Sequence, residues 1–247
     1  MTGDYPGAAA ALEAGLGLSR ELGDRIGQAS ALNELGRVRR MTGDYPGAAA
    51  ALQEALGLSR DLGDRIGQAN ALTHLGEVRR ATGDYPDAAA ALTEALAIFR
   101  GLGNRIGQAY ALNELGRGRR MAGDYPGAAA ALEESLGLYR DLGDRGGEVE
   151  VLNEAGTLRR VRGDLSEARL YHQQALDLAR QIGSSWDEAH ALAGLGRCLL
   201  TTGRNREGED MLRQALEIFQ RIGSAETADV SAELQALADA RPAPHGS

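Results

Sequence analysis

A period of forty residues organises this chain of 247 residues. Residues 1–40 and 41–80 align without gaps and differ at 8 of 40 positions. Further copies begin at residues 81, 121 and 161, and a more diverged copy begins at residue 201. A repeat of this length holds one supersecondary unit, which cannot bury its apolar face alone and is stable only when neighbours stack on it. The sequence therefore predicts a stack of repeated units rather than one globular core.

Each copy has the pattern of two helices joined by short turns. Leu72, Leu75 and Gly76 recur at three- and four-residue steps, the spacing of one buried stripe on a helix. Gly83 suits the left-handed conformation that follows a helix, and Asp84 can cap the helix after it. No segment alternates apolar and polar residues over the length of a strand. We therefore expect an all-α fold of stacked antiparallel helical hairpins.

Composition excludes several classes of function. The net charge of −8 disfavours a general nucleic-acid binder, which needs a basic field to displace counterions from phosphates. All 27 basic residues are arginine, so a Walker A lysine and a Schiff-base lysine are excluded. The one cysteine, Cys198, excludes an intrachain disulfide and a cysteine-based zinc site, and it is expected in the core. Neither a membrane span nor a secretory signal is visible, so we expect a cytoplasmic protein.

A recurring set of residues resembles the signature of the tetratricopeptide repeat. Leu35-Gly36 in a first helix, Gly43-Asp44-Tyr45 at the turn and small residues such as Ala48 in a second helix have its spacing. The forty-residue version is similar to the repeats of kinesin light chain and of spindle-orientation scaffolds, and to the arrays of large bacterial regulators and signalling ATPases. Departures include Leu32 where the family has tryptophan. The resemblance implies a right-handed α-solenoid, with glycines such as Gly36 allowing helices to approach closely.

The register of the repeat predicts how the chain is divided. Residues 1–240 are expected to form a single solenoid, in which residues 1–23 are a second helix without its partner. Five helical hairpins follow over residues 24–223, a capping helix is expected over residues 225–240, and residues 241–247 are expected to be a disordered tail. The unpaired first element indicates either a fragment of a longer array or an apolar edge that finds a partner chain and makes a homo-oligomer.

In the family, first helices line a concave groove that binds peptides, and the resemblance places fourteen candidate residues there. These are Asn33, Glu34, Arg37, Arg40, Asn70, His74, Glu77, Arg80, Tyr110, Asn113, Arg117, Arg120, Asn153 and Arg160. Four of the eight differences between the first two copies fall at these groove positions, in the first helix: Ser30/Asn70, Asn33/Thr73, Glu34/His74 and Arg37/Glu77. We interpret this as a ligand-facing surface that diversified, with free drift of exposed sites as the alternative.

Two rows of side chains across the repeats are the candidate ligand contacts. Asn33, Asn113 and Asn153 could hydrogen-bond a peptide backbone. The arginines at positions 40, 80, 120 and 160 could hold carboxylates and so favour an acidic partner. The alternative for the charged residues is structural, because arginines in the last turn complement the helix dipole and Glu34 lies three residues before Arg37.

The remaining residues give no sign of catalysis. The four histidines lack the spacing of a metal site, so no metal or cofactor is expected. His74 is expected on the groove surface, His172 on a solvated helix face, and Trp186 packed between repeats. The leading hypothesis is a non-catalytic scaffold module, part of a larger bacterial regulator, that binds a protein or peptide segment in its groove, with no nucleic-acid or membrane partner. The alternative is a structural spacer or self-association element with no peptide ligand.

Overall fold

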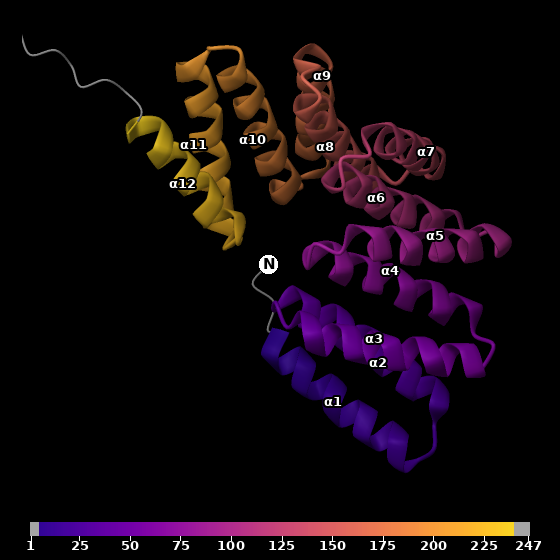
Figure 1. Cartoon of the computed structure of the whole chain (residues 1–247). Helices are drawn as coiled ribbons and strands as arrows, with labels where there is room; N and C mark the ends of the chain where they lie inside the picture. Colours follow the sequence, from indigo (N-terminus) through magenta and orange to yellow (C-terminus); the bar gives the residue numbers. More distant parts are fainter. Residues whose placement is uncertain (1–4, 240–247) are drawn as a thin grey trace, which may run out of the picture. The chain divides into compact units, whose positions relative to one another are not determined.

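The computed structural model describes residues 5–239, which are helical apart from short turns (Figure 1). The prediction of an all-α repeat fold is confirmed. The helices are α1 (Tyr5–Glu21), α2 (Arg25–Met41), α3 (Tyr45–Asp61), α4 (Arg65–Ala81), α5 (Tyr85–Gly101), α6 (Arg105–Met121), α7 (Tyr125–Leu142), α8 (Arg145–Val161), α9 (Leu165–Ile182), α10 (Ser185–Thr201), α11 (Asn205–Ile222) and α12 (Glu226–Asp239). None of these described helices is long and apolar enough to span a membrane. The tail predicted over residues 241–247 lies outside the described residues.

Glycine and a capping side chain shape the turns between helices. Gly83 has a φ of +86°, and a glycine with positive φ recurs at each turn between α1 and α12. A side chain at this φ would be strained, so glycine is the residue that lets the chain reverse there. Asp84 follows it, and its carboxylate accepts a hydrogen bond from the backbone N–H of Asp87 at the start of α5. Both predictions for this turn are confirmed.

A second kind of glycine brings the two helices of a hairpin together. A Cβ atom at Gly36 of α2 would lie 2.4 Å from Cγ of Leu52 in α3. The same contact joins Gly76 to Leu92, where the distance would be 2.6 Å. Real Cβ atoms do not approach other carbons this closely, so the leucine fills the space that the missing side chain leaves. The glycine of the Leu-Gly pair thus lets the two helices of a hairpin pack closely, as expected.

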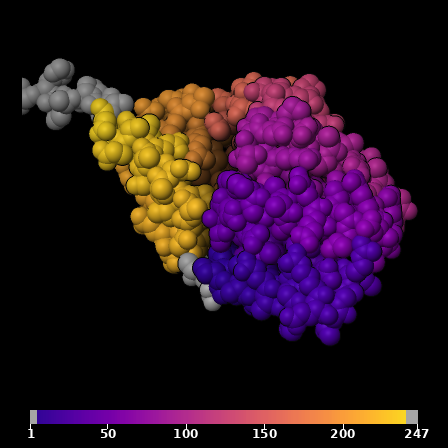
Figure 2. Space-filling model, turned by 60° about the horizontal axis from the view of Figure 1, so that its bottom comes forward, coloured from indigo at the N-terminus to yellow at the C-terminus, as the bar shows by residue number. Residues whose placement is uncertain are grey.

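The helices group into two compact units, and α1 to α7 form the first. In this unit α2 contacts α4 and α4 contacts α6, while α3 and α5 pack on the first helices before and after them. Figure 2 shows these hairpins as adjoining indigo, purple and magenta layers. Because consecutive first helices touch each other, they lie on the inner side of the stack, where a curved array presents its binding surface.

The second unit consists of α8 to α12, and it corrects one prediction. His172 of α9 is 1% exposed and lies against Gly156 and Gly194, so the prediction of a solvated face is wrong. It occupies the position that Leu52 holds in the first hairpin, which is a core position. Trp186 is 41% exposed and its ring lies against His190 of its own helix, with ring centroids 4.0 Å apart and planes inclined by 48°.

The other features of the second unit agree with the sequence. Cys198 of α10 is buried, as predicted. The last helix, α12, buries Val230 and is tied to α10 by an ion pair between Arg197 and Glu233 at 2.9 Å. In the first unit, ion pairs of this kind join one first helix to the next. The helix α12 therefore occupies the place of a further first helix after α10.

Candidate functional site: the groove of the first helices

The predicted groove residues fall into two groups when their burial is compared. Glu77, Asn113 and Asn153 are buried, so they cannot touch a ligand unless the helices rearrange. The others are partly or fully exposed on the first helices: Asn33, Glu34, Arg37, Arg40, Asn70, His74, Arg80, Tyr110, Arg117, Arg120 and Arg160. The exposed set is the surface that a ligand can reach.

Two residues of the asparagine row contact the next first helix, whereas the buried amide of Asn113 has no hydrogen-bond partner among the described residues. The side-chain amide of Asn33 donates to the backbone carbonyl of Gly67 in α4 over a long 3.5 Å. Asn153 of α8 makes the same contact with the carbonyl of Asp187 in α10, at 3.3 Å. These amides therefore contact the protein's own backbone. The prediction that they bind a peptide backbone took no account of the neighbouring helix, and it stays a prediction.

The arginine row also finds its carboxylates within the chain. Arg40 pairs with Glu77 of the next repeat at 2.8 Å, and Arg80 pairs with Glu114 at 3.1 Å. The expected pairing inside a helix is present as well, since Arg37 lies 2.8 Å from Glu34. Arg40 and Arg80 thus hold carboxylates as their chemistry predicts, but the carboxylates come from the adjacent first helix.

Glu77 of the second repeat is the centre of a network of groove side chains. Its carboxylate is 2% exposed; it accepts a hydrogen bond from the hydroxyl of Tyr110 at 2.6 Å, and Nδ1 of His74 lies 3.4 Å away. Burial would raise the pKa of Glu77, but the hydrogen bond and charge of His74, the charge of Arg40 and the Tyr110 hydroxyl outweigh it and lower that pKa. The carboxylate therefore stays ionised and holds three groove side chains in place.

The network arises because the glutamate lies one helical turn later in the second repeat than in the first. The first repeat has Glu34 followed by Arg37, whereas the second has His74 followed by Glu77. Burial and the carboxylates of Glu77 and Glu114 raise the pKa of Tyr110 well above its usual value. Its hydroxyl consequently remains a donor, and the ring is fixed at the groove surface.

A pocket of about 400 Å³ lies beside this network, between α4 and α6. Its polar and apolar lining residues are Asn70, Thr73, His74, Phe99, Asn104, Ile106, Gly107 and Tyr110. The side of the pocket formed by α6 includes Ile106, which is 62% exposed despite being fully apolar. The floor includes the buried side chains of Phe99 and Thr73.

A contact that joins first helices elsewhere is missing beside this pocket. In the first repeat Asn33 reaches across from α2 to α4, but the equivalent residue of the second repeat is Thr73. The hydroxyl of Thr73 turns back to the carbonyl of Ala69 on its own helix, at 2.8 Å. Nothing from this position then spans the gap between α4 and α6, and the gap stays open.

Sequence reasoning found some of the residues that line this pocket and missed others. It named Asn70, His74 and Tyr110, but it did not include Phe99 or Ile106. The signal for Phe99 was present, since the first two copies have serine at the equivalent positions. A change from a small polar residue to a large aromatic one at a buried position alters the shape of the adjacent joint.

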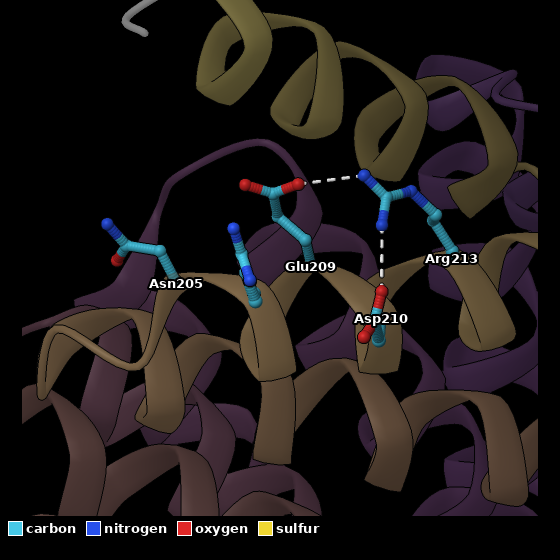
Figure 3. A pocket seen from close by; sticks show the side chains of 5 residues that line it. Asn205, Glu209, Asp210 and Arg213 are labelled. Atoms are coloured by element: carbon cyan, nitrogen blue, oxygen red, sulfur yellow. Dashed lines mark hydrogen bonds and ion pairs between the residues drawn. The ribbon is translucent and has the colours of Figure 1, made fainter.

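A second hollow, of about 550 Å³, runs along α11 in the other unit (Figure 3). Its lining residues are Asn205, Arg206, Glu209, Asp210 and Arg213, all on one helix. Arg213 pairs with Glu209 at 2.7 Å and with Asp210 at 2.8 Å, as the dashed lines show. These charges neutralise one another on an open helix face. No group of His, Cys, Asp and Glu side chains able to hold a metal ion occurs within residues 5–239.

Comparisons with known proteins give one family. Models of the tetratricopeptide repeat match residues 2–62, 67–141 and 148–221, which is most of the chain. No curated protein matches the chain in sequence.

Solved structures resemble the chain in fold. BtubC (BKLC) from P. vanneervenii is 19% identical, with a TM-score of 0.72 over 99% of this chain and 96% of that one. A signal transduction ATPase with numerous domains and a tetratricopeptide repeat sensor, PH0952 from Pyrococcus horikoshii, is 18% identical, with a TM-score of 0.71 over 87% of this chain but 33% of that one. The Rap conjugation gene regulator of plasmid pLS20, in complex with the Phr* peptide, is 16% identical, with a TM-score of 0.74 over 89% and 60%. At these identities the likeness concerns the fold.

Proposed function

The chain belongs to the tetratricopeptide repeat family, and from that premise we propose that it is a non-catalytic scaffold module that binds a peptide segment along α2, α4 and α6. The observation that carries this proposal is the pocket between α4 and α6. It is lined by residues at which the second and third repeats differ from the first, namely Asn70, Thr73, His74 and Tyr110. Apolar walls with a few placed polar groups are typical of ligand sites.

The neighbouring structures support the same reading at the level of the fold. The Rap regulator of pLS20 is a protein of this fold in complex with a peptide. The signal transduction ATPase carries its tetratricopeptide repeats as the sensor of a much longer chain. We propose that this module is likewise part of a larger regulatory protein, in a bacterial cytoplasm.

Charge bears on the choice of partner. The net charge of −8 disfavours nucleic acid, and the carboxylates held by Arg40 and Arg80 already come from the chain. An acidic partner would have to displace Glu77 or Glu114 from these pairs. We therefore propose a protein or peptide partner, without a preference for an acidic one.

Selection of peptides from a random display library against the purified chain tests the proposal. Peptides that bind the wild type should lose affinity for Tyr110→Ser, which puts the first-repeat residue into the groove. Gln53→Ala, on the exposed face of the second helix α3, is the matched control and should bind as the wild type does. A chain that selects no peptide and self-associates in light scattering would instead favour the spacer function.

A further inference from the structure

We infer that the pocket between α4 and α6 accepts one large apolar side chain, aromatic or aliphatic, of the bound segment. This inference rests on the proposed function, because it names the part of the ligand that the groove selects. It concerns the pocket lined by Phe99, Ile106, Tyr110 and their neighbours.

The first argument is that three of the polar lining groups are already engaged. The hydroxyl of Thr73 donates to Ala69, and the side chain of Asn104 accepts from the backbone N–H of Gly107 at 2.9 Å. The hydroxyl of Tyr110 donates to Glu77. With these three groups turned into the protein, an apolar side chain entering the pocket takes no hydrogen bond from them, and Asn70 lies at the exposed rim, where its amide stays in contact with water.

The second argument is the exposed apolar surface beside the floor. Ile106 is 62% exposed and belongs to the first turn of α6, while Phe99 lies beneath the pocket at the end of α5. An incoming side chain would cover the isoleucine and rest on the aromatic floor. Burial of such surface favours binding in proportion to the apolar area removed from water.

The third argument is the electrostatic character of the site. No arginine is among the described residues that line the pocket. Nearby Arg40 and Arg80 are paired with Glu77 and Glu114. A carboxylate or phosphate entering the pocket would lose its water without gaining a free cation, so charged side chains are disfavoured.

The volume of about 400 Å³ has room for one large side chain. It lies at the low end of the range of about 300–1,000 Å³ that small-molecule sites occupy. The pocket opens onto the surface of the first helices, where the rest of an extended segment can run across α2, α4 and α6. A single anchoring residue with flanking contacts is the mode of binding that this shape allows.

Two substitutions close the pocket in different ways. Thr73→Asn restores the residue found at positions 33, 113 and 153, and its amide should reach the carbonyl of Gly107 as Asn33 reaches Gly67. Asn70→Phe fills the pocket from its exposed rim on α4. Ser30→Phe adds the same ring at the equivalent exposed position of α2 and is the matched control.

The experiment measures the affinity of selected peptides by fluorescence polarisation, with an alanine scan of each peptide. We expect one large apolar peptide position whose replacement by alanine weakens binding to the wild type by about 10- to 100-fold. The same replacement should change affinity less than about threefold in Thr73→Asn and Asn70→Phe, and fully in Ser30→Phe. Circular dichroism melts check that all three variants fold.

Each outcome separates this inference from the proposed function. Peptides that bind in the groove with no apolar preference, or whose apolar preference survives both closing variants, would overturn the anchor and leave the scaffold proposal standing. A chain that selects no peptide would overturn both.

Discussion

Replacing His172 with leucine should make the second unit more resistant to acid. This imidazole is 1% exposed, and its Nδ1 lies 3.3 Å from the side-chain oxygen of Asn153. A Cβ atom at Gly194 would fall 2.3 Å from the ring, so there is no room beside it for water. A protonated ring would therefore be a buried cation without a carboxylate partner.

The size of the effect follows from the pKa of this imidazole. Burial first, and then the charges of Arg160, Arg197 and His190, lower the pKa of His172 from 6.5 to about 3. The unfolded chain then binds a proton at a higher pH than the folded one does. The stability due to the neutral ring is complete above about pH 6.5 and is lost progressively as the pH falls toward 3. At about 1.4 kcal/mol for each pKa unit, the loss between pH 7 and pH 4.5 is about 3 kcal/mol.

Urea unfolding of the wild type, His172→Leu and His172→Gln at pH 7 and pH 4.5 measures this loss. Trp186 is the single tryptophan and lies in the same unit, so its fluorescence reports the relevant transition. Both variants lack the titrating group, although they differ in packing. Each should lose about 3 kcal/mol less than the wild type between the two pH values, whatever its stability at pH 7.

The loss of unfolding free energy between pH 7 and pH 4.5, compared between the wild type and the two variants, is the result that could refute the reasoning. If wild type and both variants lose the same free energy of unfolding on acidification, then His172 is protonated in the folded chain and its pKa is not depressed. Leucine is expected to fit, because Leu52, Leu92 and Leu132 occupy the equivalent positions.

Two further predictions concern the first unit. Glu77→Gln should lower the free energy of unfolding by about 1–3 kcal/mol at pH 7, because it removes the charge that Arg40 faces. Since the pKa of Glu77 is below 4.5, that difference should shrink as the pH falls below 4.5, and urea titrations at pH 7 and 3.5 that give equal differences would contradict it. Gly76→Ala should cost about 1–3 kcal/mol by forcing a Cβ onto Leu92. Gly57→Ala, whose Cβ would meet nothing within 4 Å, should stabilise α3 by up to about 1 kcal/mol, and thermal melts that move in the same direction would refute the packing argument.

The regular part of this fold follows from local rules, which the sequence displays openly. Gly83 and Asp84 can be interpreted one turn at a time, because a left-handed glycine and a capping carboxylate act within a few residues. The contact of Gly36 with Leu52 recurs at Gly76 and Gly116, so its signal is present several times over. Such features depend on spacing, and spacing is what a single sequence records.

The site was harder to predict because its properties arise between repeats. Asn33 and Arg40 have the chemistry expected of ligand contacts, yet each reaches a residue of the next repeat. Thr73 was visible as a difference, but its effect is the absence of a bridge, which only the adjacent helix makes apparent. His172 illustrates the same limit, because comparison with Leu52 would have placed it in the core while its polarity favoured solvent.

Hydrogen bonds and ion pairs cross from one forty-residue copy to the next, so the contacts at each joint depend on which two copies meet there. If residues 41–80 were excised, Arg40 would inherit Glu114, the carboxylate that Arg80 now holds, and Asn33 would face Gly107. The shortened chain would again have an asparagine contact between these neighbouring first helices and would lose the pocket, although neither Phe99 nor Tyr110 had been altered. Ligand recognition in this protein consequently depends on which copies are adjacent. Changing the order of whole copies would alter it without any substitution.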